Sequence, residues 1–280
     1  MRVALGQLPI SSDPRVNLDR VRAAASAAAR EGADLAVFPE GTQARFSTDL
    51  PSVAEPVDGD FCRGLAEVAK ANGLAVIAGV FEPAPNRSVF NTTVAFDRNG
   101  DLAAAYRKIH VFDALGHRES DSVTPGDDVV IASLSGLRIG FMTCYDVRFP
   151  ELARALAAGG ADLLVLPAAW AAGPFKEEHW VTLVRARAIE NTIWVAAAGQ
   201  VPDPAEPPTK ATTGIGRSMV VDPMGVVKLD LGPAEGLGAG DVDTEQTARV
   251  RTVLPSLANR RTDVFAIETG LDRLGLGRPG

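Results

Sequence analysis

Apolar and polar positions along this 280-residue chain follow one pattern twice. Each copy has three apolar runs of strand length that alternate with two stretches of helical spacing. The apolar runs lie at residues 2–8, 33–40 and 73–80 in the first copy and at 137–146, 161–170 and 192–199 in the second. The helical stretches lie at residues 14–31, 59–72, 150–158 and 176–190. The middle runs, ADLAVFPE and ADLLVLPAAW, are close in sequence, which predicts an internal repeat.

Each copy then adds a predicted β-hairpin, with its turn at Asn99-Gly100 in the first copy and at Met224-Gly225 in the second. The apolar runs lack clean alternation, which indicates strands that are buried on both faces. Helices would cover one face of each sheet, and the two sheets would bury their other faces against each other. The pattern therefore predicts one α/β domain, a four-layer α-β-β-α sandwich with an internal pseudo-twofold repeat. Two separate domains are the alternative, but residues 120–136 contain no linker, and the proline-rich segment 201–213 indicates a surface loop.

Composition and charge exclude several classes of partner. Hydrophobic residues make up 46% of the chain and charged residues 22%, which is typical of a globular protein. The net charge of -7 and the pI of about 5.1 disfavour phosphate backbones, so we expect no nucleic-acid partner. No run reaches the roughly 18 apolar residues of a membrane span, and the first residues lack a signal region. We therefore expect a cytoplasmic protein with no membrane partner.

Cysteine and histidine are rare in this chain. It has two cysteines, Cys62 and Cys144, and three scattered histidines, none with the spacing of a zinc site. The sequence has no Walker loop and no GxGxxG between a strand and a helix. We expect no metal and no cofactor.

Three residues at predicted strand ends are candidates for chemistry. Cys144 lies where an apolar strand gives way to a helix, a turn that exposes a nucleophile and places backbone N–H groups near an oxyanion. An inert buried cysteine is the alternative there, and it is the preferred interpretation of Cys62, which lies in a helical pattern. Glu40 ends a buried strand, either as a surface carboxylate or as a base in a cleft. Lys108 ends the strand LAAAYRK, where most lysines are solvated edge charges.

Together these segments resemble the nitrilase superfamily of carbon–nitrogen hydrolases. The resemblance rests on LAVFPE at Glu40, AYRKIHVFD at Lys108, RESDSVTPGD at 118–127, TCYDVRFPEL at Cys144, LPAAW at 166–170 and VRARAIENTIWVAAAGQ at 184–200. These motifs occur in the family's order from one end of the chain to the other. The resemblance implies a carbon–nitrogen hydrolase domain at 1–263 and a C-terminal tail at 264–280.

The resemblance implies a thiol mechanism. Cys144 attacks the substrate carbonyl, Glu40 acts as the general base, and Lys108 stabilises the oxyanion. The backbone N–H of Tyr145 assists Lys108, and the charge of Lys108 is expected to lower the pKa of the thiol. Glu119 occupies the place of a second glutamate found in many members, where it would orient Lys108 or the attacking water. A charge in a surface loop is the alternative for Glu119.

The residues around the nucleophile indicate a branch of the superfamily. True nitrilases usually have Trp-Glu after the cysteine, and carbamoylases have a polar residue there, whereas Tyr145 and Asp146 follow Cys144. CYDVRFPEL and KIHVFDALGHRESD are similar to the Nit subgroup, which includes ω-amidases and deaminated glutathione amidases. That similarity implies short amides of dicarboxylates as substrates. Arg148 would bind the substrate carboxylate, or would instead form a salt bridge with Asp146 or Glu151.

Two departures from the subgroup leave the substrate open. The segment GTQARFS after Glu40 is unlike that of ω-amidases, and Trp170 stands where a smaller residue or phenylalanine is usual. A bulky indole at the wall of the acyl pocket would narrow or reshape it. The alternatives are a carbamoylase or nitrilase on the same site, a glutaminase subunit, and a non-enzymatic binding protein. A non-enzymatic binding protein would not need Glu40, Lys108, Cys144 and Glu119 together. The resemblance also implies a homodimer or a higher homo-oligomer.

Overall fold

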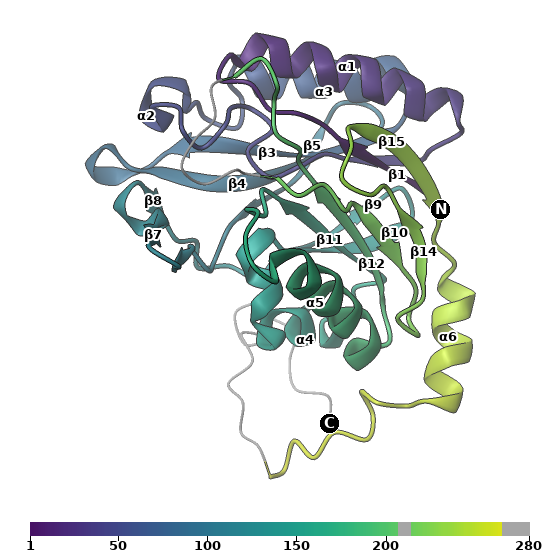
Figure 1. Cartoon of the computed structure of the whole chain (residues 1–280). Helices are drawn as coiled ribbons and strands as arrows, with labels where there is room; N and C mark the ends of the chain where they lie inside the picture. The colour runs from purple at the N-terminus through teal and green to yellow at the C-terminus, as the bar shows by residue number, and fades with distance from the viewer. Residues whose placement is uncertain (207–213, 265–280) are drawn as a thin grey trace.

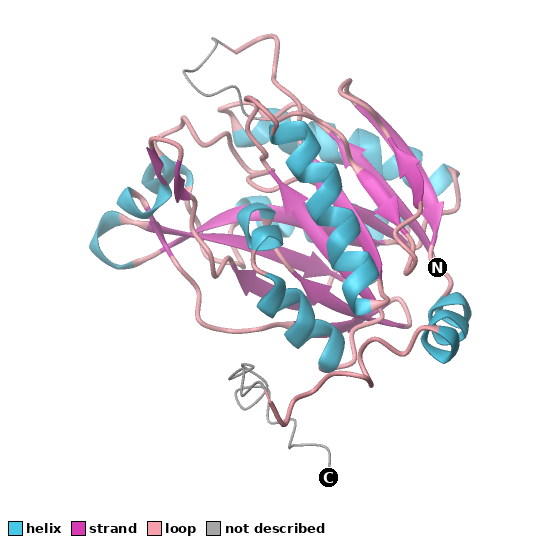
Figure 2. Ribbon diagram, turned by 60° about the horizontal axis from the view of Figure 1, so that its bottom comes forward, coloured by secondary structure: helices cyan, strands magenta, loops and turns pink. Residues whose placement is uncertain are grey.

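Four layers make up the protein, with two β-sheets packed face to face and helices outside each sheet (Figure 1). The computed structural model describes residues 1–206 and 214–264. A second view shows the long helix of the second half lying across its sheet (Figure 2). The predicted α-β-β-α sandwich is confirmed. The predicted tail at 264–280 lies outside the described residues except for Val264.

The first sheet has the strand order β15-β1-β2-β3-β4-β5. Strands β1, β2 and β3 are parallel, while β15, β4 and β5 join antiparallel. The bounds are Arg2–Gln7 for β1, Leu35–Val37 for β2, Ala75–Pro83 for β3, Val89–Phe96 for β4, Leu102–Arg107 for β5 and Gly236–Asp241 for β15. A short strand, β8 (Val123–Thr124), pairs with β4. Helices α1 (Pro14–Arg30) and α3 (Asp60–Asn72) cover the outer face (Figure 1).

The second sheet repeats this arrangement in the order β14-β13-β12-β11-β10-β9. Strands β10, β11 and β12 are parallel, with antiparallel strands on both sides. The bounds are Ile131–Leu134 for β9, Leu137–Phe141 for β10, Leu163–Ala168 for β11, Trp194–Gly199 for β12, Met219–Val221 for β13 and Val227–Asp230 for β14. Helices α4 (Pro150–Ala158) and α5 (Lys176–Asn191) cover its outer face (Figure 1). The two predicted hairpins are β4–β5 and β13–β14.

Burial on both faces explains why the strand sequences do not alternate. In β1, Val3 and Leu5 join the core between the sheets, whereas Ala4 joins the core beneath α1 and α3. Successive side chains of a strand point to opposite faces, so a strand between two cores is apolar throughout. Local signals fix the helix ends: the side chain of Asp13 accepts a hydrogen bond from Arg15 N–H at the start of α1, and Gly73, at φ 64°, ends α3.

Smaller elements complete the fold. They are α2 (Leu50–Val53), β6 (Asp113–Ala114), β7 (His117–Arg118), α6 (Thr244–Val253), and 3-10 turns at Pro85–Arg87, Glu119–Asp121 and Cys144–Arg148. Two predicted strands are shorter than expected, because β2 ends at Val37 and β10 at Phe141. Glu40 and Cys144 therefore lie in the turns that follow their strands. Across residues 1–206 and 214–264, no helix is long and apolar enough to cross a membrane.

Candidate active site

Glu40, Lys108 and Cys144 converge although they come from both copies of the repeat. Glu40 follows β2, Lys108 follows β5, and Cys144 begins the turn after β10. The Lys108 ammonium donates to Glu40 Oε1 at 2.9 Å, and the Cys144 thiol is hydrogen-bonded to the same carboxylate. All three are buried, with exposed fractions of 1% for Glu40, 2% for Lys108 and 8% for Cys144. A nucleophile, a carboxylate and a cation thus share one site that is nearly closed to water.

Hydrogen bonds to both oxygens fix the carboxylate of Glu40. Besides Lys108, the side-chain amide of Asn91 on β4 donates to Oε1 at 2.7 Å. The backbone N–H of Ala169, just past β11, donates to Oε2 at 2.8 Å. The backbone of Glu40 lies directly against Gly79 of β3, where a Cβ atom would stand 2.3 Å from the nitrogen of Gly41. Gly79 therefore allows the chain after β2 to cross β3 closely enough to set the Glu40 carboxylate in place.

Lys108 is held between two carboxylates. Its ammonium donates to Glu119 Oε2 at 2.8 Å and to Glu119 Oε1 at 3.1 Å, in addition to Glu40. Burial alone would lower the pKa of Lys108, but the charges of Glu119 and Glu40 outweigh it and raise that pKa well above its usual range. Lys108 is therefore a permanent cation in this site.

Glu119 is a buried member of the site and not a surface loop charge. It is 3% exposed and opens the 3-10 turn Glu119–Asp121. Besides Lys108, Asn91 donates to its Oε1 at 3.2 Å, and the backbone N–H of Phe112 donates to its Oε2. Burial raises the pKa of Glu119, but Lys108 overcomes this effect and leaves the pKa below its usual value. Glu119 thus carries a charge that anchors Lys108.

Cys144 sits on a strained turn. Its φ is 46°, in the left-handed region that non-glycine residues rarely adopt, and such strain is concentrated at functional positions. Thr143 and Asp146 cap the turn reciprocally, since each side chain accepts a hydrogen bond from the other's backbone N–H. The backbone N–H of Tyr145, in the first turn, has no acceptor among the described residues. This free donor lies next to the thiol in the chain.

Lys108 was expected to lower the pKa of the Cys144 thiol. It does so, but the net shift is upward, so the expectation of a lowered pKa is wrong. Burial and the charge of Glu40 raise the pKa of Cys144 well above its ordinary value, and the opposing influence of Lys108 is smaller. The resting residue is therefore a neutral thiol. Its proton lies beside the carboxylate that could accept it.

Asp146 ties the nucleophile turn to the end of β5. Its side chain accepts hydrogen bonds from the Tyr106 hydroxyl at 2.6 Å and from the Thr143 backbone N–H at 2.8 Å. The backbone N–H of His110 donates to the same carboxylate at 3.0 Å, and His110 Nδ1 lies 2.8 Å from it. Asp146 therefore joins the segment that carries Lys108 to the turn that carries Cys144.

Two of the three predicted substrate-binding residues, Tyr145 and Arg148, belong to the nucleophile turn, and the third, Trp170, lies against Arg148. The Tyr145 ring makes edge contacts with the rings of Phe112 and Phe149. The guanidinium of Arg148 lies 4.8 Å from the centroid of the buried Trp170 ring. In the described part of the chain Arg148 forms no salt bridge with Asp146 or Glu151, the alternative considered from sequence; its polar contact is His179 Nδ1 at 3.4 Å.

Two groups that hold the Glu40 carboxylate were not predicted from the sequence. The amide of Asn91 bridges Glu40 and Glu119, and the backbone N–H of Ala169 binds Glu40. Asn91 has a sequence signal, because a polar residue interrupts the apolar run of its strand. Every residue except proline has a backbone N–H, so the sequence does not mark the one at Ala169, which the fold alone brings to Glu40.

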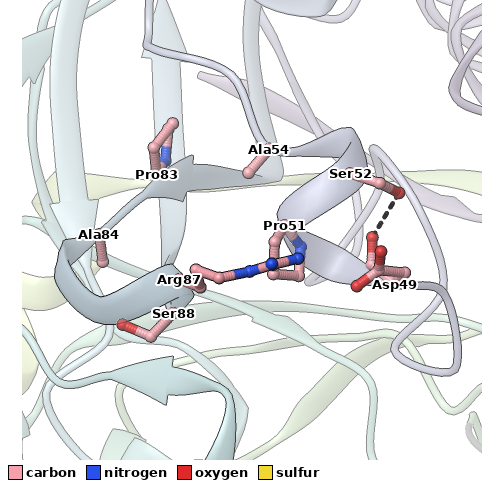
Figure 3. A pocket seen from close by; sticks show the side chains of 8 residues that line it. All are labelled: Asp49, Pro51, Ser52, Ala54, Pro83, Ala84, Arg87 and Ser88. Carbon is pink, nitrogen blue, oxygen red and sulfur yellow. Dashed lines mark hydrogen bonds between the residues drawn. The ribbon is translucent and has the colours of Figure 1, made fainter.

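A separate groove lies between α2 and the β3–β4 connection (Figure 3). Its volume is about 330 Å³, and it is lined by Asp49, Pro51, Ser52, Ala54, Pro83, Ala84, Arg87 and Ser88. Arg87 extends across it toward Pro51 (Figure 3). None of its lining residues belongs to the site around Cys144. Within 1–206 and 214–264, no group of three or more His, Cys, Asp or Glu side chains is placed to hold a metal ion.

Residues 2–252 match the model of the carbon-nitrogen hydrolase family. A hydrolase of Mycobacterium tuberculosis is 41% identical over 98% of this chain and 100% of its own length. The deaminated glutathione amidase of Escherichia coli O157:H7 is 36% identical over 93% of this chain and 97% of its own. The omega-amidase NIT2 of Mus musculus is 34% identical over 96% and 98%.

Solved structures agree with this assignment. An amidase from Nesterenkonia sp. AN1 has a TM-score of 0.79 and 28% identity, and the match covers 94% of this chain and 95% of that one. The NitFhit protein of C. elegans has a TM-score of 0.85 and 27% identity. That match covers 94% of this chain but 66% of the NitFhit chain, so this chain spans just under two thirds of that longer protein.

The chain therefore belongs to the carbon-nitrogen hydrolase family, a class of enzymes that hydrolyse non-peptide C–N bonds. Within the nitrilase superfamily it belongs to the Nit branch, and its activity is amide hydrolysis. The family match ends at residue 252, and the domain boundary at 263 stays a prediction.

Proposed function

We propose that this protein hydrolyses a small, carboxylate-bearing amide through Cys144, with Glu40 as general base and Lys108 as oxyanion partner. The observation that carries the proposal is the shared carboxylate of Glu40, which contacts both the Cys144 thiol and the Lys108 ammonium. Structures of the Nesterenkonia amidase record covalent addition of acrylamide, and of the acetamide moiety of fluoroacetamide, at its active-site cysteine. These adducts support a cysteine nucleophile in this chain.

The reaction begins when Cys144 Sγ attacks the substrate carbonyl and its proton passes to Glu40. Protonation removes the charge that binds Glu40 to Lys108. An ammonium has three donors, and in the resting site they contact one oxygen of Glu40 and both oxygens of Glu119. The donor released from Glu40 turns to the new oxyanion, and the N–H of Tyr145 supplies a second one.

The second half of the reaction returns every group to its starting state. Glu40 gives its proton to the leaving nitrogen, and ammonia departs from the thioester formed at Cys144. Glu40 then takes a proton from water, which attacks the thioester carbonyl, and returns that proton to the departing sulfur. Glu119 remains ionised throughout and holds Lys108 in position.

The substrate carboxylate is assigned to Arg148, with Trp170 as the wall of the acyl pocket. Support comes from the position of Arg148, four residues past the nucleophile and with no acidic partner among the described residues. A guanidinium matches a carboxylate with two parallel hydrogen bonds. The relatives named omega-amidase and deaminated glutathione amidase support the choice of an amide substrate.

Ammonia release from a panel of amides, nitriles and N-carbamoyl compounds tests the proposal. We expect turnover of dicarboxylate monoamides, and we expect Cys144→Ala to reduce it by about 10³-fold or more with folding intact. Cys62→Ala is the matched control, because Cys62 is buried in the core beneath α1 and α3, where burial raises its pKa to about 12. Full turnover by Cys144→Ala would refute the assignment, and preference for nitriles or carbamoyl compounds would refute the substrate class.

A further inference from the structure

Lys176, the first residue of α5, is a buried cation without an acidic partner. It is 5% exposed, and its ammonium lies 4.2 Å from the centroid of the Trp170 ring and 5.0 Å from that of Phe112. In the part of the chain that the structure describes, this ammonium makes no ion pair and no hydrogen bond. Aromatic faces attract a cation, but they replace only part of the hydration that burial removes.

A second cation shares the same aromatic wall. The guanidinium of Arg148 is also placed over the Trp170 ring, at 4.8 Å. The acidic side chains closest in sequence to the two cations are engaged elsewhere: Asp146 binds Tyr106 and His110, and Glu177 pairs with Arg217. Arg148 and Lys176 thus concentrate positive charge at Trp170 without a described carboxylate to balance it.

This charge lies within electrostatic reach of the nucleophile. Burial lowers the pKa of Lys176, proximity to Cys144 opposes that shift, and the charge of Arg148 adds to it. Trp170 directly follows Ala169, whose backbone N–H binds the Glu40 carboxylate. The Trp170 indole in turn donates to the backbone oxygen of Lys176 at 2.8 Å. The start of α5, with its partial positive charge, is therefore fixed against Trp170, one residue from the backbone N–H that binds Glu40.

We propose that Lys176 and Arg148 form a dual cationic subsite that binds the carboxylate of the substrate and rejects substrates that carry an ammonium group. The inference rests on the proposed amide hydrolysis and specifies its substrate further. A bound carboxylate supplies the counter-charge that both side chains lack. An ammonium placed on the same acyl chain faces two cations at short range. The favoured substrate is therefore a dicarboxylate monoamide with no amino group.

Steady-state kinetics on three amides of equal chain length test the subsite. Glutaramate carries the carboxylate alone, glutamine adds an α-ammonium, and pentanamide has neither charge. We expect the wild type to prefer glutaramate over glutamine. Lys176→Met should lower kcat/KM for glutaramate by about 10- to 100-fold, mainly through KM, because a charge-assisted contact made in both ground and transition states is lost.

Controls separate this role from a structural one. Turnover of pentanamide by Lys176→Met should stay near that of the wild type, the preference for glutaramate over glutamine should shrink, and Lys176→Arg should restore much of it. Lys228→Met removes an exposed lysine from β14 and should change none of these ratios. Equal losses on all three amides would overturn the inference, and so would no loss on glutaramate.

A binding measurement is independent of turnover. Glutarate should bind Cys144→Ala about 10-fold or more tightly than it binds Cys144→Ala/Lys176→Met, as measured by calorimetry. Equal affinities would overturn the subsite even if the amides are hydrolysed. Loss of glutarate affinity in an enzyme that hydrolyses no amide would instead uphold the subsite and refute the proposed function.

Discussion

At the scale of single residues, the balance of charge determines whether the Cys144 thiol is protonated in the resting enzyme. Lys108 is the one cation in direct contact with Glu40 and Glu119 within the described chain, so the buried cluster retains one excess negative charge. That excess and burial keep the thiol protonated. A neutral thiol beside an ionised base is a resting state suited to general-base catalysis, in which the proton moves as the new bond forms.

The sequence identified the residues whose chemistry is carried by a motif, and it missed those whose role depends on folding. Glu40, Lys108, Glu119 and Cys144 lie in recognisable segments, and the structure brings all four together. Lys176 lies in a polar segment, KEEH, that is typical of the exposed first turn of a helix. Only the packing of α5 against Trp170 shows that this lysine is buried.

At the scale of elements, the parallel strands and their covering helices were predictable, whereas β15 was not. Its sequence, GLGAGD, has no apolar run and no alternation of apolar with polar residues, because glycine takes every second position. Val220 of the second sheet occupies the space beside Gly240, where a Cβ atom would lie 3.2 Å from that side chain. The Leu231 side chain likewise occupies the space where a Cβ atom of residue 238 would lie. Close packing of the two sheets therefore requires glycine at these positions. The local sequence gives no indication of that packing.

Glu206 anchors the segment after β12 to the loops at the N-terminal side of α1. Its carboxylate accepts hydrogen bonds from the backbone and side chain of Ser12 and from Ser11, and it pairs with Arg45 at 3.2 Å. The contacts with Ser12 lower the pKa of Glu206 to about 2. Because this pKa lies below its value in the unfolded chain, about 4.3, the stabilisation is full at higher pH and is lost as pH falls toward 2.

We expect Glu206→Gln to lower the free energy of unfolding at pH 7, and the difference from the wild type to shrink as pH falls from 5 toward 3. Urea unfolding at several pH values measures this difference. Glu235→Gln, a change at a carboxylate in the turn before β15, is the control and should show no such trend. A constant difference across the range would mean that the charge of Glu206 does not stabilise the loop.

At the scale of the whole molecule, the repeat explains how one site draws on both halves. The two sheets have equivalent strand orders and pack face to face, and the turns after β2 and β10 meet where Glu40 contacts Cys144. The first half supplies the base and the cation, and the second half supplies the nucleophile. The pseudo-twofold arrangement was predictable from the duplicated apolar pattern, because that pattern records burial on both faces of each central strand.

The predicted homodimer can be tested on an exposed apolar patch of the second half. Ile189 on α5 and Met224 and Val226 in the β13–β14 turn are 42%, 50% and 52% exposed. The Ile189 side chain lies against Gly225, between Met224 and Val226, so the three residues are neighbours. Exposed apolar patches mark protein interfaces. Light scattering should give twice the 29.3 kDa chain mass at micromolar concentration, and Ile189→Glu should shift it toward the monomer. A monomeric mass for the wild type would contradict the dimer.

The covalent intermediate at Cys144 is the central claim, and mass spectrometry of a reaction quenched in acid tests it most directly. The enzyme is mixed with glutaramate, quenched during turnover and digested with trypsin. The account predicts a glutaryl thioester on the peptide of residues 139–148, which contains Cys144, and an unmodified peptide of residues 46–63, which contains Cys62. A glutaryl group on Cys62, or undiminished turnover in the Cys144→Ala variant, would contradict it.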